Sequence, residues 1–233
     1  MRRAREILKD IIFPQRCMFC NDITAYPHYI CEECKINYPL KDMEICKRCG
    51  KYRENCICRD LSASVYRMAS ACPYEGDAIN KIKAFKSDKE SLLGDDFADM
   101  LCRVLSDMKD GEFFPYITYI PMEKEKIKMR GHNMAKTLAS KIAQRTGRKL
   151  IEPPIEKVYT EKFQHDLKRK ERFKNASLSF LDKGNPVEGN IILIDDIITT
   201  GATISRASDI LVNNGAGKVL ALSIASTQKR ERQ

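Results

Sequence analysis

Apolar segments alternate with amphipathic segments in the second half of the chain. Mainly apolar runs predict buried strands at residues 191–194 and 219–226. Between them, residues 203–214 carry apolar side chains at helical spacing and stop before Gly215, a residue type that often ends helices. A strand, a helix and a second strand in this order are typical of a parallel sheet covered by helices.

The same alternation extends toward the N-terminus with weaker signals. Further strands are expected at residues 63–72, 116–120, 158–160 and 176–181. Further helices are expected at residues 78–86, 95–108 and 133–145, and a short basic helix at residues 1–15. We therefore predict an α/β fold for residues 61–233, with a mostly parallel sheet and helices on both faces.

The composition supports a globular chain without a membrane span. Hydrophobic residues make up 43% of the 233 positions, and no apolar run approaches the roughly 18 residues of a membrane-spanning helix. The first residues are basic but lack the apolar stretch of a secretory signal. These features predict a cytoplasmic protein.

Ten cysteines are unusual for that compartment, where disulfides are rare, and eight of them fall within residues 17–58. Closely spaced pairs of thiolates are the usual ligands of structural Zn²⁺. The pairs are Cys17/Cys20, Cys31/Cys34, Cys46/Cys49 and Cys56/Cys58.

The simplest interpretation is a zinc-binding module at residues 16–60 that holds two structural Zn²⁺ ions, one for each consecutive pair of motifs. Interleaved pairing is an open alternative, as are redox dithiols and an iron–sulfur cluster. Gly50 permits the left-handed turn that such a motif often needs. His28 is either a structural or exposed residue of the first zinc loop or a replacement for one cysteine ligand.

Positive charge is concentrated in one part of the chain. The formal net charge is +9, and residues 123–175 hold 16 Lys/Arg against seven Asp/Glu, a difference that equals the whole excess. Clustered cations favour a polyanionic partner, although a solvated surface is the alternative. The aromatic residues within or near this segment, on which bases can stack, are Tyr159, Phe163, Phe173 and Phe180.

The segment that follows the strand at residues 191–194 carries the clearest chemistry. Asp195 and Asp196 come first, and both are suited to accept hydrogen bonds from ribose hydroxyls or to hold Mg²⁺. Small and hydroxylated residues then lead into the next helix, where backbone N–H groups can surround a phosphate. These residues are Thr199, Thr200, Gly201, Ala202 and Thr203. A metal site alone or a simple turn cap are the alternatives.

This segment resembles the 5-phosphoribosyl-1-pyrophosphate (PRPP) motif of type I phosphoribosyltransferases, and the whole chain resembles the ComF family. The cysteine module is similar to the double zinc ribbon of that family. Further matching residues are Tyr74, Glu75, Gly76, Lys81, Lys83, Lys86, Pro121, Arg130, Gly131, His132, Asn133, Gln164, Arg172 and Asn175. The resemblance implies a type I phosphoribosyltransferase-like domain preceded by a small zinc-ribbon module.

The resemblance also implies roles for individual residues. Asp195 and Asp196 would contact the ribose, and residues 199–203 would hold the 5′-phosphate. The turn at residues 121–124 would form the pyrophosphate loop, and residues 160–175 would form a loop over the site. Candidates for binding pyrophosphate or nucleic acid are Lys124, Arg130, Lys168, Arg169 and Arg172. Thr199 stands where purine-salvage members of the wider group carry an acidic general base.

The resemblance implies a role in natural competence, in which the chain assists the uptake of single-stranded DNA together with a ComFA-type ATPase. The alternative is an Mg²⁺-dependent phosphoribosyltransferase that transfers phosphoribose from PRPP to a base and releases pyrophosphate. A third hypothesis joins the two, with PRPP as a ligand that regulates DNA binding. Whether the chain is an enzyme is left open by the sequence.

Overall fold

The computed structural model of the chain describes residues 14–24, 28–37, 45–87, 93–157 and 180–228. The helix expected at residues 1–15 therefore lies almost entirely outside the described residues, as does the strand expected at residues 158–160. Within the described residues, no helix combines the length and the apolar content needed to cross a membrane.

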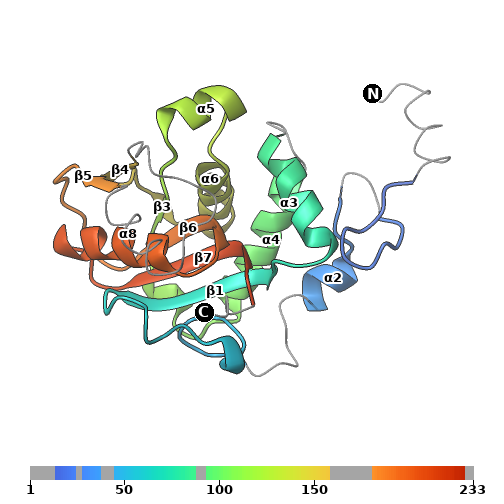
Figure 1. The fold of residues 1–233 in the computed structure, drawn as a ribbon, viewed down its shortest axis with the longest axis horizontal. Coiled ribbons are helices and arrows are strands. Elements are labelled where there is room, and N and C mark those ends of the chain that lie inside the picture. The colour runs from blue at the N-terminus through green and yellow to red at the C-terminus, as the bar shows by residue number, and fades with distance from the viewer. Residues whose placement is uncertain (1–13, 25–27, 38–44, 88–92, 158–179, 229–233) are drawn as a thin grey trace.

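A five-stranded parallel sheet forms the centre of the fold (Figure 1). Its strand order is β1-β7-β6-β2-β3, and every neighbouring pair is parallel. The strands are β1 (Val65–Pro73), β7 (Val219–Ser226), β6 (Ile191–Ile198), β2 (Tyr116–Tyr119) and β3 (Lys149–Leu150). The expected α/β class and mostly parallel sheet are confirmed.

Helices cover both faces of the sheet, as expected. Ile192 and Ile194 of β6 pack in one core group with helices α3 (Asp77–Ser87), α4 (Leu93–Ser106) and α6 (Met134–Thr146). Ile191 and Leu193 alternate to the opposite face, where they pack with helix α8 (Ala202–Asn213). Both faces of β6 are therefore buried, which explains its unbroken run of branched aliphatic residues.

β6 is longer than expected, because it continues through the acidic pair to Ile198. Parallel pairing with β7 extends along the same length and ends at Ile198 beside Ser226. Backbone hydrogen bonds of a neighbouring strand therefore hold two aspartates in extended conformation, although their polarity suggested that the strand had already ended.

A two-stranded antiparallel sheet stands apart from the main sheet and consists of β4 (Ile155–Lys157) and β5 (Phe180–Asp182). β5 overlaps the end of the strand expected at residues 176–181, whose first four residues lie outside the described part. Helix α5 (Lys124–Arg130) was not expected, and it begins at Lys124, the last residue of the turn assigned to residues 121–124.

The cysteine module contributes to both core groups. Cys17, Met18 and Ile30 belong to the group on the α4 face, close to the short helix α2 (Glu32–Asn37). Ile57 and Leu61 belong to the group on the α8 face. Two 3-10 helices, Arg53–Asn55 and Gly111–Phe113, complete the described elements. The two halves of the module therefore pack on opposite faces of the sheet.

Candidate functional site

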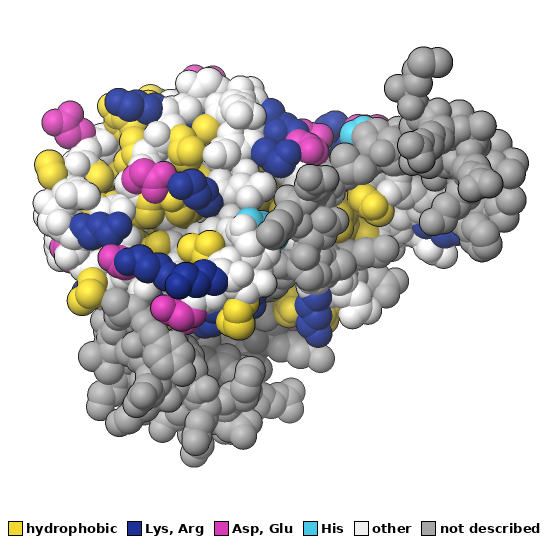
Figure 2. Space-filling view, turned by 90° about the horizontal axis from the view of Figure 1, so that it is seen from above, with side chains coloured by type: hydrophobic (Ala, Val, Ile, Leu, Met, Phe, Trp, Pro, Cys, Tyr) yellow, Lys and Arg dark blue, Asp and Glu magenta, His cyan; other side chains and the backbone are white. Residues whose placement is uncertain are grey.

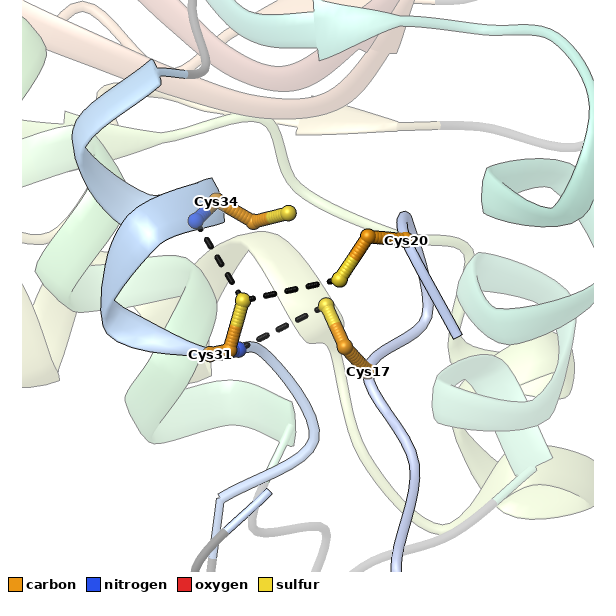
Figure 3. Close-up of side chains that lie close together, drawn as sticks. All are labelled: Cys17, Cys20, Cys31 and Cys34. Atoms are coloured by element: carbon orange, nitrogen blue, oxygen red, sulfur yellow. Dashed lines mark hydrogen bonds between the residues drawn. The ribbon is translucent and has the colours of Figure 1, made fainter. Parts of the chain in front are cut away.

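Four cysteines from the first two motifs meet at one point. Cys17, Cys20, Cys31 and Cys34, here called the first cysteine cluster, have sulfur atoms that all lie within 4.8 Å of one another. Figure 3 shows the four side chains directed toward a common centre, with Cys31 and Cys34 at the start of α2. Backbone N–H groups of Phe19 and Cys31 donate to Cys17 Sγ at 3.5 Å, which stabilises a thiolate there.

The remaining two motifs form the second cysteine cluster, which consists of Cys46, Cys49, Cys56 and Cys58. The Sγ of Cys46 lies 3.5 Å from that of Cys58, and the Sγ of Cys49 lies 3.7 Å from that of Cys56. Gly50 adopts the expected left-handed conformation with a φ of 65°. Consecutive pairing is therefore confirmed, and the interleaved alternative is wrong.

The sulfur spacing fits Zn²⁺ in both clusters. Sulfur atoms bound tetrahedrally at ~2.3 Å from a common ion lie roughly 3.8 Å apart, close to the spacing seen here. A disulfide requires about 2.05 Å, and all eight cysteines are free thiols in the structure. Eight thiolates thus provide two complete four-ligand sets, which fit two structural zinc ions with no open coordination position.

His28 is not needed as a zinc ligand, because four thiolates complete the first cluster. Its Nδ1 instead lies 2.8 Å from Oδ1 of Asp96 in α4. The same carboxylate accepts the Tyr29 N–H at 2.6 Å and lies 2.9 Å from Lys35 Nζ. Asp96 is fully buried, so these contacts replace its hydration and dock the first cysteine cluster onto α4.

A cleft with a volume of about 150 Å³ opens just beyond the end of β2, beside the second half of β6. β2 leads through α5 to α6, which packs on one face of the sheet, and β6 leads to α8, which packs on the other. Connections that diverge in this way leave a crevice at the carboxyl ends of the strands, where ligands bind in open α/β sheets. The topology therefore predicts a binding site at this cleft.

Asp195 and Asp196 both line the cleft from β6. Burial raises the pKa of Asp195 to about 8, and the negative charge of Asp196 acts in the same direction. The Asp196 N–H, donated to Asp195 Oδ1 at 2.8 Å, and the charge of Lys157 oppose this rise. Asp195 is therefore largely protonated at neutral pH, whereas a cation beside the pair would favour its ionised form.

Three cationic side chains line the same cleft as the aspartates. Lys126 and Arg130 come from α5, and Lys157 comes from the end of β4. Buried Glu123 accepts from Lys126 Nζ at 2.9 Å and so fixes the first of these cations. Lys124, one of the expected phosphate ligands, is 77% exposed and pairs with Glu156 at 2.8 Å, so it does not line the cleft.

The start of α6 forms a further wall of the cleft, and Asn133 holds it in place. Asn133 Oδ1 accepts the N–H groups of Ala135 and Lys136, which caps the helix. Its Nδ2 donates to the carbonyl oxygen of Ile120 at 3.0 Å, just beyond the end of β2. The positive end of a 13-residue helix therefore borders a cleft that already contains three cations.

Residues 199–203, here called the threonine loop, connect β6 to α8 beyond the acidic pair. Gly201 has a φ of 77° and occupies the N-cap position of α8. The Ala202 N–H donates weakly to Thr200 Oγ1 at 3.4 Å, and Thr199 is exposed. The loop and the acidic pair belong to one continuous segment, but the loop does not line the cleft itself.

Some cleft residues were missed by sequence reasoning. Lys126 and Lys157 lie in a generally basic segment, so their sequence carried no signal that separated them from their neighbours. Asn133 was named as a matching residue but not as a site residue. Its position did carry a signal, because an asparagine directly before an amphipathic helix is a typical N-cap. The candidates Lys168, Arg169 and Arg172 lie outside the described residues, as do the matching residues Gln164 and Asn175.

Comparison with known proteins gives three findings. The double zinc ribbon domain family matches residues 8–73. Competence protein ComFC of Bacillus subtilis (strain 168) is 30% identical over 210 residues, which cover 80% of this chain and 79% of that protein. DNA utilization protein YhgH of Salmonella typhi is 24% identical over 219 residues, covering 88% and 94%.

Among solved structures, orotate phosphoribosyltransferase from Aeropyrum pernix aligns with a TM-score of 0.33 and 16% sequence identity. The alignment covers 60% of this chain and 77% of that chain.

Proposed function

Because the chain belongs to the family of competence protein ComFC, we propose that it handles single-stranded DNA during DNA uptake and that its cleft binds a phosphorylated ribose. Sequence similarity supports the role in handling single-stranded DNA, because the relatives named for competence and for DNA utilization match over 79% and 94% of their lengths. The acidic pair in the cleft supports the binding of a phosphorylated ribose.

The described surface supports binding to a nucleic acid backbone. Lys128 and Arg130 are exposed on α5, next to Met129, which is 78% exposed. Figure 2 shows Lys and Arg side chains beside exposed apolar side chains, with some acidic groups among them. Cations neutralise phosphates and apolar surface contacts bases, so this combination suits a single strand. Lys168, Arg169 and Arg172, which lie outside the described residues, are proposed from the sequence as further phosphate contacts.

Fluorescence anisotropy with a labelled oligonucleotide tests this proposal. Binding should occur at ~50 mM salt and weaken steeply as salt is added, because each neutralised phosphate releases counterions. Replacing Lys128 and Arg130 together with alanine should make the negative slope of log affinity against log salt shallower by about 1.4, at roughly 0.7 per phosphate. Lys109→Ala, an exposed substitution outside the cleft, is the matched control. Absence of binding at ~50 mM salt would refute the proposal.

The phosphoribosyl half of the proposal assigns roles according to the resemblance. Asp195 and Asp196 accept hydrogen bonds from the ribose hydroxyls, and the threonine loop donates N–H groups to the 5′-phosphate. Lys126, Arg130 and Lys157 replace Lys124 as the cations that face the pyrophosphate. Mg²⁺ enters this proposal only together with PRPP, whose charge it would neutralise while the acidic pair orients the sugar.

A thermal shift assay tests ligand binding directly. PRPP with Mg²⁺ should raise the melting temperature, because a ligand that binds only the folded state stabilises it. The shift should disappear in a variant with both Asp195→Asn and Asp196→Asn, measured against the same variant without PRPP. An unchanged melting temperature of the wild-type protein would show that the cleft no longer serves this ligand.

A second candidate function is transfer of phosphoribose from PRPP to a base with release of pyrophosphate. The cleft itself favours it, because an acidic pair and three cations converge there. Thr199 argues against phosphoribosyl transfer, because its side chain has no carboxylate that could act as general base. Pyrophosphate release from PRPP with a panel of purine and pyrimidine bases decides between a ligand site and an active site.

The proposal also includes a ComFA-type ATPase as partner and a cytoplasmic location, both implied by the resemblance. Coprecipitation of the two purified proteins in the presence of single-stranded DNA is the simplest test of the partner.

A further inference from the structure

Ile57 and Leu61, which flank ligands of the second cysteine cluster, pack directly against the threonine loop. A methyl group added at Gly201 would lie 2.5 Å from Leu61 Cδ2 and 3.2 Å from Ile57 Cδ1. Ile57 stands between the ligands Cys56 and Cys58, and Leu61 follows three residues later. The backbone of the loop therefore touches side chains whose position depends on a metal cluster.

A second contact joins this cluster to the start of the loop. Lys51, which is 2% exposed, donates from Nζ to the carbonyl oxygen of Thr227. The Thr227 N–H in turn donates to Ile198 O at 3.0 Å, and its hydroxyl donates to Thr199 O at 3.4 Å. Lys51 lies two residues after the ligand Cys49, so the end of β6 is linked to the cluster through Lys51 and Thr227.

A third contact reaches the helix that follows the loop. The Ser62 N–H donates to Ser205 Oγ at 3.2 Å, and the Ser62 hydroxyl donates to Asp209 Oδ1. Both partners lie on α8, Ser205 in its first turn. Residues that flank the ligands of the second cysteine cluster thus contact the loop, the strand before it and the helix after it.

The first cysteine cluster differs in this respect. Tyr29 and Ile30, which precede its ligand Cys31, donate their N–H groups to Asp96 of α4, and Cys17 and Cys34 belong to the core group on the opposite face of the sheet. The two clusters therefore offer an internal comparison, because they share their ligand chemistry but contact different parts of the fold.

We propose that the metal-bound second cysteine cluster sets the conformation of the threonine loop, with Leu61 and Lys51 as positioning residues. Metal binding supplies much of the folding free energy of such small modules, so the cluster loses its structure with its metal. Gly201 would then lose the packing that holds its left-handed conformation. Loss of the second zinc would weaken binding of a phosphorylated sugar. This last step rests on the proposed function of the loop.

Leu61→Ala tests the proposal with all eight zinc ligands intact. Hydrogen–deuterium exchange of residues 198–205 should become roughly tenfold faster, because exchange follows local opening. PRPP affinity should fall about 10- to 100-fold, as expected when binding groups are misplaced. The conservative variant Leu61→Met should keep both the exchange rate of residues 198–205 and the PRPP affinity at their wild-type values. Ile30→Ala, which truncates a buried residue beside Cys31 of the first cluster, should leave both values unchanged.

A metal-depleted variant provides the second measurement. Cys46→Ser combined with Cys58→Ser should reduce the zinc content to one ion per chain and accelerate exchange in residues 198–205. Loop exchange unchanged in Leu61→Ala, or accelerated equally in Ile30→Ala, would overturn the proposal whatever the ligand. If the wild-type protein binds no PRPP but loop exchange responds only to Leu61→Ala, the ligand assignment fails and the positioning role stands.

Discussion

Asp195→Asn removes a buried carboxyl group whose pKa is raised to about 8 by burial and by the charge of Asp196. The asparagine has the same shape, and its carbonyl oxygen can still accept the Asp196 N–H that Asp195 accepts at 2.8 Å. The substitution therefore removes a titrating group while it keeps the packing and the hydrogen bond. We expect it to stabilise the ligand-free protein above pH 4.

The sign follows from proton binding. An unfolded Asp ionises near pH 3.9, whereas the folded protein keeps this proton up to about pH 8. Between these values the folded state binds one proton more, so wild-type stability falls as pH rises, with a limiting slope of about 1.4 kcal/mol per pH unit. The cleft is open to solvent, which reduces the total. We expect Asp195→Asn to be more stable than wild type by about 3 kcal/mol at pH 8.

Urea unfolding at several pH values between 6 and 8.5, with zinc-loaded protein and no PRPP, measures this difference. Asp182→Asn is the control, because the Gly184 N–H and the Asn214 amide lower the pKa of Asp182. That variant should be less stable than wild type by an amount that hardly changes over this pH range. The reasoning would be contradicted if Asp195→Asn were less stable than wild type at pH 8, or if the difference in unfolding free energy between the two proteins did not change with pH.

Three further predictions concern the scaffold, and a fourth concerns its metal. Asp96→Asn should lower the free energy of urea unfolding by about 3 kcal/mol, because buried Lys35 loses the one fully buried carboxylate among its charged partners. Asn133→Ala should cost about 1 kcal/mol in the same assay through loss of the α6 cap, and should also weaken PRPP binding. Gly50→Ala should cost about 1–3 kcal/mol, because its Cβ would lie 2.7 Å from Met68 O in a left-handed conformation. Removal of metal by a chelator should release two Zn²⁺ per chain, measured with a colorimetric dye, and should lower the melting temperature.

Local patterns were sufficient for most of the fold. The strand at Val219–Ser226 and the helix before it were predicted with ends that agree to within one residue, because both sides of β7 are buried and α8 is amphipathic. The short helix α5 was missed. Its seven residues bury none of their side chains, so it has no apolar face that a sequence pattern could reveal.

The candidate site was predicted in part. The order of strand, acidic pair, small residues and helix identified Asp195 and Asp196 as site residues, and both line the cleft. Which cations accompany them depends on how β2, α5 and β4 converge on β6. Lys124 and Lys126 are two residues apart with the same chemistry, yet only Lys126 lines the cleft. The helical turn after Glu123 decides between them.

The sequence by itself determined the chemistry of this protein: eight thiols in metal-binding pairs, an acidic pair at the end of a buried strand, and a small-residue loop before a helix. These features are local, because each depends on residues within about one element. Only the tertiary structure decided which elements meet. It placed the two cysteine clusters on opposite faces of one sheet and brought Leu61 against Gly201, 140 positions later in the chain. Such contacts depend on the packing of distant segments into a common core, which no local pattern specifies.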